Sequence, residues 1–346
     1  MPKRKAPAGT FWRNGVLWGR TQVGARDHKW SLRTDDPAIA KRRREEERAR
    51  IVAAVHFGVE ARKTFADALE AWEQTIVRQV APTTAARYAV SLGQLQPFLD
   101  GLFLDEINGS RVAEIIRQRT AHGATNATIK RDLVALSSVI SFAIDQGWRE
   151  DNPVLPRMRR LKERRDPIVL PEPEHIRAVI ERAPGMFARL IEAALRTGAR
   201  QEELAGARRA QVDHGRRELT LMGKGNKRRT ISLDPFDGYE ALRALPAALG
   251  GAFLFWHDQG ERYANVASRF RAIVREVARK QGFKPFRFHD LRHRHAVDWL
   301  QSGRSIYDLQ HRLGHSSIKT TEVYLAFLTP EQTRTVKSGT FSGTPG

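Results

Sequence analysis

The segment HDLRHRHAVDWLQSGRSIYDLQHRLGHSSIKTTEVY, residues 289–324, carries a dense group of chemically active side chains. His289 and Arg292 are three residues apart, a spacing that places both on one face of a helix. His315 stands in a Gly-His-Ser-Ser turn between two expected helices, and Tyr324 follows nine positions later. This combination predicts a binding site for an anionic group beside a nucleophile.

Two upstream motifs add charge of the same sign. In TGARQEEL, residues 197–204, Arg200 lies just past Gly198 at the expected start of a helix, where backbone N–H groups also favour an anion. In GKGNK, residues 223–227, Lys224 occupies the turn of an expected hairpin, from which a long side chain reaches over a site. Two arginines converging on one phosphodiester would neutralise it and hold the charge that develops during displacement.

The remaining roles in a phosphodiester displacement fall to Tyr324 and Lys224. The pKa of an unperturbed tyrosine is about 10, so we expect the neighbouring arginines, lysine and histidines to favour the phenolate of Tyr324. A lysine serves as a general acid for a leaving 5′ oxygen. A covalent phosphotyrosine conserves the energy of the broken bond, so we expect no cofactor.

Other interpretations of these residues are weaker. His289 and His293 are four apart, but no Glu follows His289 as in His-Glu-x-x-His and no third ligand stands out, so we expect no metal. The Gly-Lys-Gly turn is too short for a P-loop. Alone, Tyr324 would be a core tyrosine and Arg200 a surface charge. The prediction rests on the order of all the elements: Arg200, Lys224, His289, Arg292, His315 and Tyr324.

The composition bounds the class of protein. The 346 residues suggest two or three domains, and the net charge of +20 makes nucleic acid the commonest partner for such a chain. The alternative reading of this charge is a basic nucleic-acid binder without chemistry. There is no cysteine, no signal-peptide core and no apolar run of membrane-spanning length. We therefore expect a cytoplasmic, DNA-associated protein with no membrane partner.

The N-terminal segment, residues 1–60, predicts a small β-rich module. Asn14-Gly15 is a hairpin signal among short aromatic and β-branched runs, and Asp36-Pro37 begins a helix that runs to about Phe57. The Lys/Arg/Glu pattern at 41–47 is either a solvated face or a set of arginines laid on DNA.

The rest of the chain divides by composition. Residues 61–152 show helical periodicity, with Thr64 and Asp67 as a capping pair. Residues 153–171 hold four prolines and many basic residues, which predicts an extended linker. Residues 172–328 mix helices, among them 201–208, 237–247 and 317–327, with a hairpin at 218–221 and 228–233. The Thr/Ser/Gly-rich residues 329–346 predict a flexible tail.

These motifs, in this order, resemble the tyrosine recombinases of the phage-integrase family. The resemblance covers residues 64–328 and rests on Thr-Gly-x-Arg-x-x-Glu-Leu, His-x-Leu-Arg-His and Leu-Gly-His-Ser. It assigns the catalytic roles to Arg200, Lys224, His289, Arg292, His315 and the nucleophile Tyr324, with Lys227 as a second choice for the lysine. Glu203 and Leu204 match packing and orienting positions. The sequence departs from the family after His293, where it reads Arg294-His295-Ala296-Val297, and this leaves the local helix packing open.

The resemblance implies a multidomain fold, mainly α with small β-sheets: a β-rich arm-binding module, a helical, SAM-like core-binding domain and an α+β catalytic domain. It implies a site-specific recombinase that integrates or excises a mobile element through a 3′-phosphotyrosine. The implied partners are double-stranded DNA attachment sites, three further copies in a homotetramer and, by analogy, an excision factor or a DNA-bending protein. The alternatives are a catalytically silent DNA-binding relative and a type IB topoisomerase-like nicking enzyme.

Overall fold

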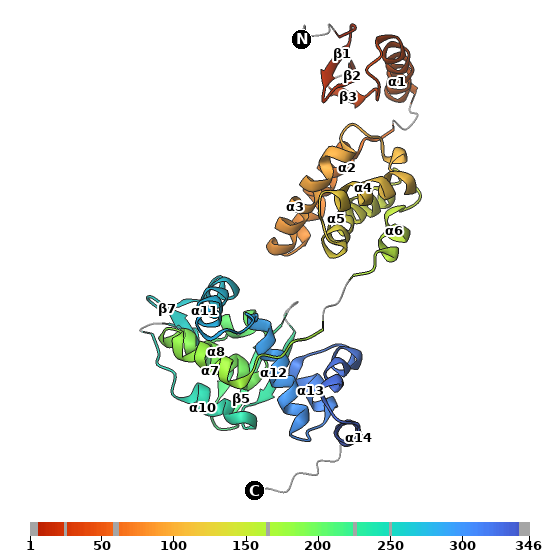
Figure 1. The fold of residues 1–346 in the computed structure, drawn as a ribbon. Helices are drawn as coiled ribbons and strands as arrows, with labels where there is room; N and C mark the ends of the chain where they lie inside the picture. The colour runs from red at the N-terminus through yellow and green to blue at the C-terminus, as the bar shows by residue number, and fades with distance from the viewer. Residues whose placement is uncertain are drawn as a thin grey trace. The chain divides into compact units, whose positions relative to one another are not determined.

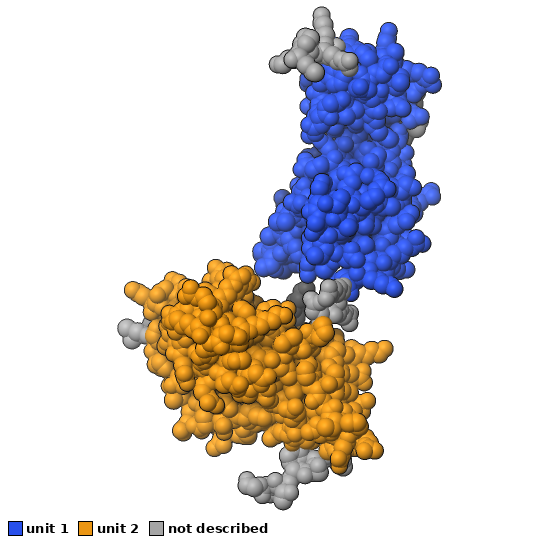
Figure 2. Space-filling model, in the orientation of Figure 1, with its two compact units in different colours: residues 1–166 blue, residues 167–346 orange. Residues whose placement is uncertain are grey.

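The computed structural model describes residues 6–23, 26–57, 62–163, 167–223, 227–248 and 251–338. The chain divides into two compact units, residues 1–166 and 167–346 (Figure 2). Both are built mainly from helices with small antiparallel sheets (Figure 1). None of the described helices combines the length and the apolar character needed to cross a membrane.

The first unit begins with the predicted β-rich module. Its antiparallel strands are β1 (Thr10–Arg13), β2 (Val16–Val23) and β3 (Arg26–Ser31), in the order β1-β2-β3. Asn14 and Gly15 have φ angles of 50° and 77°. Asn-Gly adopts these positive angles readily in a two-residue hairpin turn, which confirms the hairpin expected at this dipeptide.

Helix α1 (Pro37–Phe57) covers this sheet. It starts where Asp36 Oδ1 accepts a hydrogen bond from the Ala38 amide at 2.7 Å, as the capping pattern predicted. Between helix and sheet lies a small apolar core, and one of its members, Phe103, comes from the following helical bundle. The buried members are Leu17, Trp30, Leu32, Ala40, Ile51 and Phe103.

The helical bundle fills the rest of the first unit. Its helices are α2 (Phe65–Thr75), α3 (Pro82–Leu99), α4 (Gly109–Ala121), α5 (Asn126–Asp145) and α6 (Val154–Arg160). The Thr64 side chain accepts from the Asp67 amide at 3.1 Å, and the Asp67 carboxylate accepts from the Thr64 amide at 2.9 Å, so the predicted capping pair is confirmed. Helix α5 has buried residues along most of its length and forms the centre of the bundle.

Helix α6 replaces the first part of the linker expected at 153–171, and the described residues after it, 161–163 and 167–172, form no helix or strand. Asn152 begins the helix by accepting from the Val154 amide at 3.1 Å and donating to the Ser137 side chain at 3.0 Å. Val154 is fully buried in the bundle core, and Met158 and Leu161 pack against it. This sparse i, i+4, i+7 apolar row is sufficient because its partner surface on the bundle is already formed.

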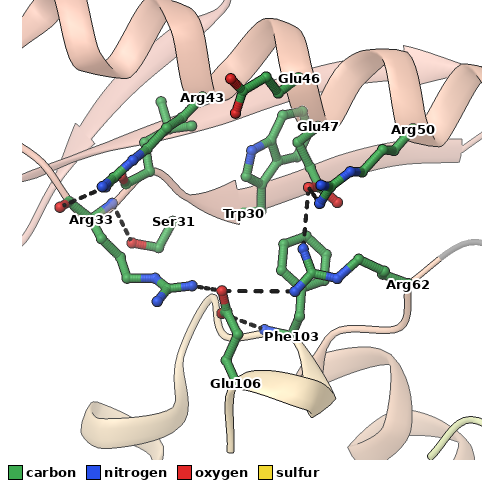
Figure 3. A pocket seen from close by; sticks show the side chains of 11 residues that line it. Trp30, Ser31, Arg33, Arg43, Glu46, Glu47, Arg50, Arg62, Phe103 and Glu106 are labelled. Atoms are coloured by element: carbon green, nitrogen blue, oxygen red, sulfur yellow. Dashed lines mark hydrogen bonds and ion pairs between the residues drawn. The ribbon is translucent and has the colours of Figure 1, made fainter.

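Charged side chains join the N-terminal module to the bundle (Figure 3). Arg33 of the module pairs with Glu106, which follows α3. Arg62 lies over the Phe103 ring at 4.2 Å and pairs with Glu47 of α1 at 3.3 Å and with Asp105 at 2.6 Å. The contact therefore combines one buried aromatic anchor with a surrounding set of ion pairs.

The second unit surrounds a larger core. Its helices are α7 (Pro173–Arg182), α8 (Gly185–Thr197), α9 (Gln201–Ala205), α10 (Gly238–Arg243), α11 (Val266–Gln281), α12 (Phe288–Gln301), α13 (Ile306–Leu313) and α14 (Pro330–Ser338). One sheet has the order β4-β5-β6, from Val212–Asp213, Glu218–Met222 and Arg228–Ser232. The antiparallel pair β5 and β6 is the predicted hairpin, and β7 (Trp256–His257) and β8 (Glu261–Arg262) form a second, short one.

Three expected helices differ in length or type. Helix α9 ends at Ala205 instead of 208, because Gly206 caps it and Arg208 enters a β-bridge with Phe253. Helix α10 ends at Arg243 instead of 247. The helix expected at 317–327 is instead two 3₁₀ segments, Ile318–Thr320 and Glu322–Phe327, separated by the fully buried Thr321. The tighter coil brings Thr321 and Tyr324 onto the same buried side.

The expected flexible tail begins with an ordered helix. Thr329 and Gln332 cap α14 reciprocally, with bonds of 2.9 and 3.2 Å. Val336 is fully buried in a cluster that also contains Leu300, Leu309 and Tyr324. A single apolar anchor therefore outweighs the Thr/Ser/Gly-rich composition; residues 339–346 lie outside the described part of the chain.

Candidate active site

The first turns of α12 carry the centre of the site. The Asp290 carboxylate accepts from the Arg287 amide at 2.6 Å and caps the helix. His289, Arg292 and His293 follow at positions i, i+3 and i+4, so they share one face, as the sequence predicted. The ring centroids of His289 and His293 are 4.8 Å apart.

Arg292 is buried and held by the backbone of two other segments. Its side chain donates to the Gly198 carbonyl at 2.7 Å and to the Leu313 carbonyl at 2.6 Å. The residue is only 2 % exposed. Burial, with the charge of Arg200 second, lowers the pKa of Arg292 to about 9, so it stays cationic at neutral pH.

His315 has a defined tautomer. Its Nε2 lies 3.0 Å from Nη2 of Arg292, which only donates, so Nε2 accepts. The proton therefore sits on Nδ1, which lies 2.9 Å from the Thr321 hydroxyl. Burial, followed by the charges of Arg292 and Arg200, lowers the pKa of His315 to about 4. The imidazole is therefore neutral in the free protein.

Arg200 is the more open arginine. It stands at the N-terminus of α9, its side chain is 42 % exposed, and its Nη2 lies 3.4 Å from the Gly314 carbonyl. Glu203 orients it, because the carboxylate accepts from the Arg200 amide at 2.7 Å and from Nη1 at 3.1 Å. Its open guanidinium can meet a ligand without first being uncovered.

Arg229 of β6 completes this arrangement. It binds both carboxylate oxygens of Glu203, at 2.5 and 2.6 Å, and donates to the Arg312 carbonyl at 3.0 Å. Burial alone would raise the pKa of Glu203, but the hydrogen bonds from Arg229 and the Arg200 backbone outweigh it and hold that pKa below its ordinary value. Glu203 is therefore an anion that keeps two arginines in place.

Tyr324 is 2 % exposed, and its hydroxyl lies 2.9 Å from Nδ1 of His293. Burial raises the pKa of Tyr324, and the charges of Arg292 and Arg200 only partly oppose this. The expected preference for the phenolate is therefore not found in the free protein, because desolvation exceeds the attraction of the arginines. Burial, with His289 second, also lowers the pKa of His293 to about 4, so this imidazole is a neutral acceptor for the phenol.

The structure brings five of the six predicted positions into one region of the second unit, and the sixth, Lys224, lies outside the described residues. Arg292 and His315 are bonded to each other, and Arg200 donates to the carbonyl of the residue before His315. Tyr324 is bonded to His293, which follows Arg292 on α12, and His289 lies at the exposed edge beside His293. Desolvation by surrounding protein atoms, with Arg292 second, lowers the pKa of His289. The second choice for the lysine, Lys227, is exposed at the base of the hairpin.

Sequence reasoning missed three contributors. His293 and Thr321 stood within the quoted motifs without a catalytic role, and Arg229 was one of several basic residues on a hairpin strand. Only the four-residue spacing of His293 from His289 on α12 offered a signal. Arg229 binds residues of distant segments, and the partner of Thr321, His315, lies six residues away across a turn whose geometry the sequence does not give.

A separate cluster has the ligand types for a metal ion. Among the described residues, His257, Asp258 and Glu261 place one ligand atom each within 4.8 Å of one another, on the β7–β8 hairpin. The Asp258 side chain is 79 % exposed and bonded to His257. This group includes none of the predicted site residues.

Two family models and several sequence relatives match the chain. The Phage integrase family model matches residues 172–329, and the model of the SAM-like N-terminal domain of phage integrases matches residues 69–147. Tyrosine recombinase XerC of Mycobacterium tuberculosis is 30 % identical over 260 residues, covering 70 % of this chain and 87 % of the relative. XerC of Roseiflexus castenholzii is 27 % identical over 275 residues, covering 71 % and 84 %.

Solved structures share the fold. A lambda integrase dimer bound to a COC′ core site matches with a TM-score of 0.63 and 20 % identity, covering 94 % of this chain and 96 % of that one. The Tn1549 transposon integrase in complex with transposon right end DNA matches with a TM-score of 0.61 and 19 % identity, covering 77 % and 96 %. Together with the sequence relatives, these findings show that the chain belongs to the phage integrase family of tyrosine recombinases and is a site-specific DNA recombinase.

Proposed function

We propose that this recombinase cleaves and rejoins duplex DNA through a covalent 3′-phosphotyrosine on Tyr324, and that it integrates or excises a mobile element. The observation that carries the proposal is the side-chain network around Arg292. It links a buried arginine, a neutral histidine and a more open arginine within one cluster, and a tyrosine bound to a second histidine stands beside it.

The arginines would receive the scissile phosphate. Arg200 is open enough to meet it directly, while Arg292 is fixed by two carbonyls and needs little reorganisation. Such preorganised donors act mainly on charge that develops in the transition state. His315 accepts from Arg292 through Nε2, so it would donate to a phosphate oxygen only after protonation, which the negative charge of the bound phosphate favours.

The nucleophile would be the Tyr324 oxygen. It attacks phosphorus, its proton passes to His293 Nδ1, and the bond from phosphorus to the 5′ oxygen breaks. A bound phosphate carries negative charge, which raises the pKa of nearby histidines and so favours this transfer. Lys224 would supply the proton to the leaving 5′ oxygen, and the reverse sequence joins a new DNA end.

The N-terminal module is the feature that favours the mobile-element role. The module packs a three-stranded sheet on a helix with many basic residues, and we propose that it binds arm-type DNA sites. A matching solved structure is a lambda integrase tetramer bound to a Holliday junction. By that likeness we propose a homotetramer on two attachment sites, with an excision factor or a DNA-bending protein as a further partner.

The test is covalent capture on DNA. The protein is incubated with a nicked duplex carrying a candidate attachment site and resolved on a denaturing gel, and binding is measured separately. We expect a DNA band shifted by the mass of the protein for the wild type and none for Tyr324→Phe, with similar DNA affinity for both. A wild type that binds this DNA tightly without forming the band would favour the binding-only alternative. Relaxation of supercoiled DNA by a monomer would favour the topoisomerase-like alternative.

A further inference from the structure

Arg312, the penultimate residue of α13, is a buried cation. It is 6 % exposed and donates to the Ser232 carbonyl at 2.7 Å and to the Arg196 carbonyl at 3.3 Å. Its Nε donates to Nε2 of His295 at 3.0 Å, and its guanidinium lies 5.0 Å from the centroid of the Trp299 ring. Among the described residues, its hydrogen-bond partners are carbonyls and an imidazole, with no carboxylate.

His295 must be neutral in this arrangement. Its Nε2 accepts from Arg312, so its Nδ1 carries the proton and donates to the Leu195 carbonyl at 2.9 Å. The residue is 1 % exposed, and burial, followed by the charge of Arg312, lowers its pKa well below the ordinary value. The pair thus consists of one permanent charge and one fixed tautomer. His295 belongs to the stretch 294–297 in which the sequence departs from the family pattern.

The pair ties together the ends of two helices. Leu195 and Arg196 lie in the last turn of α8, where carbonyls lack partners within the helix and carry partial negative charge. Arg312 binds one of these carbonyls and His295 binds the other. Arg312 also belongs to the last turn of α13, and the Ser232 carbonyl of β6 fixes it from a third side.

The two helix ends are also the segments that hold Arg292. Gly198, two residues after Arg196, gives one carbonyl to Arg292, and Leu313, next to Arg312, gives the other. Gly198 has a φ of +66°, and a Cβ built there would lie 2.4 Å from Cδ2 of His295. The imidazole therefore sets the position of the Gly198 turn by direct contact.

We propose that His295 and Arg312 are positioning residues that keep the Gly198 and Leu313 carbonyls at the separation Arg292 requires. The inference rests on the proposed cleavage by Tyr324 for its kinetic readout only. Apolar residues often replace a buried polar pair as a whole without loss of stability, whereas removing one member of the pair is destabilising. Melting temperatures of the single variants therefore have to accompany the kinetics, so that a shift of Arg292 is distinguished from a loss of folding.

The kinetic test measures single-turnover cleavage at saturating DNA, together with DNA affinity and melting temperature. We expect Arg312→Leu and His295→Phe to slow cleavage by about tenfold to a hundredfold, because each leaves its partner unpaired and shifts the turn, with DNA affinity unchanged. His295→Gln should restore most of the rate, because its amide both accepts and donates. Arg334→Leu and His311→Gln, at exposed positions on α14 and α13, are the matched controls.

A second readout does not depend on cleavage. In protein labelled with ¹⁵N at arginine, the guanidinium N–H signals of Arg292, assigned with Arg292→Lys, report how firmly its carbonyl partners hold it. We expect Arg312→Leu to speed their exchange with water and His295→Gln to leave it near the wild-type value. Unchanged Arg292 exchange and wild-type cleavage in Arg312→Leu would overturn the inference. If the wild-type protein forms no covalent adduct but Arg312→Leu still speeds the exchange of the Arg292 guanidinium protons, the inference is upheld and the proposed function is refuted.

Discussion

Arg292 and Arg200 carry the same charge in different environments, and this separates their effects. Removing the buried Arg292 side chain leaves the Gly198 and Leu313 carbonyls without donors, whereas Arg200 is partly solvated. We expect Arg292→Ala and Arg200→Ala each to slow cleavage by a factor of about 10² or more.

Only the Arg292→Ala variant should also lose several degrees of melting temperature. Single-turnover cleavage and thermal melts of both variants check this, with Arg334→Ala as the exposed control. Equal melting temperatures for the two variants would contradict the structural role of Arg292 between the Gly198 and Leu313 carbonyls. A wild-type cleavage rate in either variant would contradict the proposal that both arginines bind the scissile phosphate.

The neutral histidines give the stability of the second unit a pH dependence. The pKa values of His293 and His315 are about 4 in the folded protein, against about 6.5 for an unperturbed histidine. Between these pH values the unfolded chain binds more protons than the folded one, so stability rises with pH over this window and falls as the solution is acidified.

We expect the melting temperature to drop steadily as the pH falls from about 6.5 toward 4, and His293→Gln to make that drop shallower. Thermal melts across this pH range, in a buffer of constant ionic strength, measure the slope. His311→Gln, at an exposed position, is the control and should leave it unchanged. An identical slope for His293→Gln and the wild type would show that the His293 proton equilibrium does not change on folding.

Among the elements, α14 offers a clear test of how the end of the chain is held. Val336 is its one fully buried side chain and packs in the cluster that contains Tyr324. We expect Val336→Ala to reduce the free energy of unfolding by about 2 kcal/mol, through lost burial and the cavity it leaves. Lys337→Ala, next to it and exposed, should change it little. Denaturant unfolding measures the free energy of unfolding of both variants. Equal free energies for the two would mean that α14 does not stabilise the unit.

The elements also show which features the sequence could predict. The β5–β6 hairpin and α5 follow from strong periodicity and turn signals within one segment. Helices α6 and α14 were missed because each depends on one or two apolar anchors, Val154 and Val336, that bury against surfaces formed elsewhere. The site also has a part that the sequence could predict and a part that it could not. The spacing of His289, Arg292 and His293 placed them on one helix face. The hydrogen bonds from Arg229 to Glu203 and from Arg312 to His295 join different segments of the chain, which the sequence does not pair.

At the scale of the whole molecule, the N-terminal module shares a core with the bundle that follows it. Phe103 is 6 % exposed among residues of the module, and a Cβ built at Gly101 would lie 2.4 Å from the Trp18 ring. Arg13 pairs with Asp100 at 2.6 Å, beside the ion pairs of Arg33 and Arg62. Removing the module therefore uncovers an apolar surface, which by itself destabilises or aggregates the remainder.

This contact dictates how the role of the module is tested. Deleting residues 1–60 should be combined with Phe103→Ser, so that the exposed anchor becomes polar, and the same substitution in the full chain is the control. We expect the truncated protein to form the covalent adduct at a core site but to fail in complete recombination, because the proposed catalytic residues belong to the second unit and the proposed arm contacts are lost. Recombination equal to that of the full chain would mean that the module does not bind arm sites. If the truncated protein forms no adduct at a temperature at which it is still folded, the module acts on the cleavage step itself.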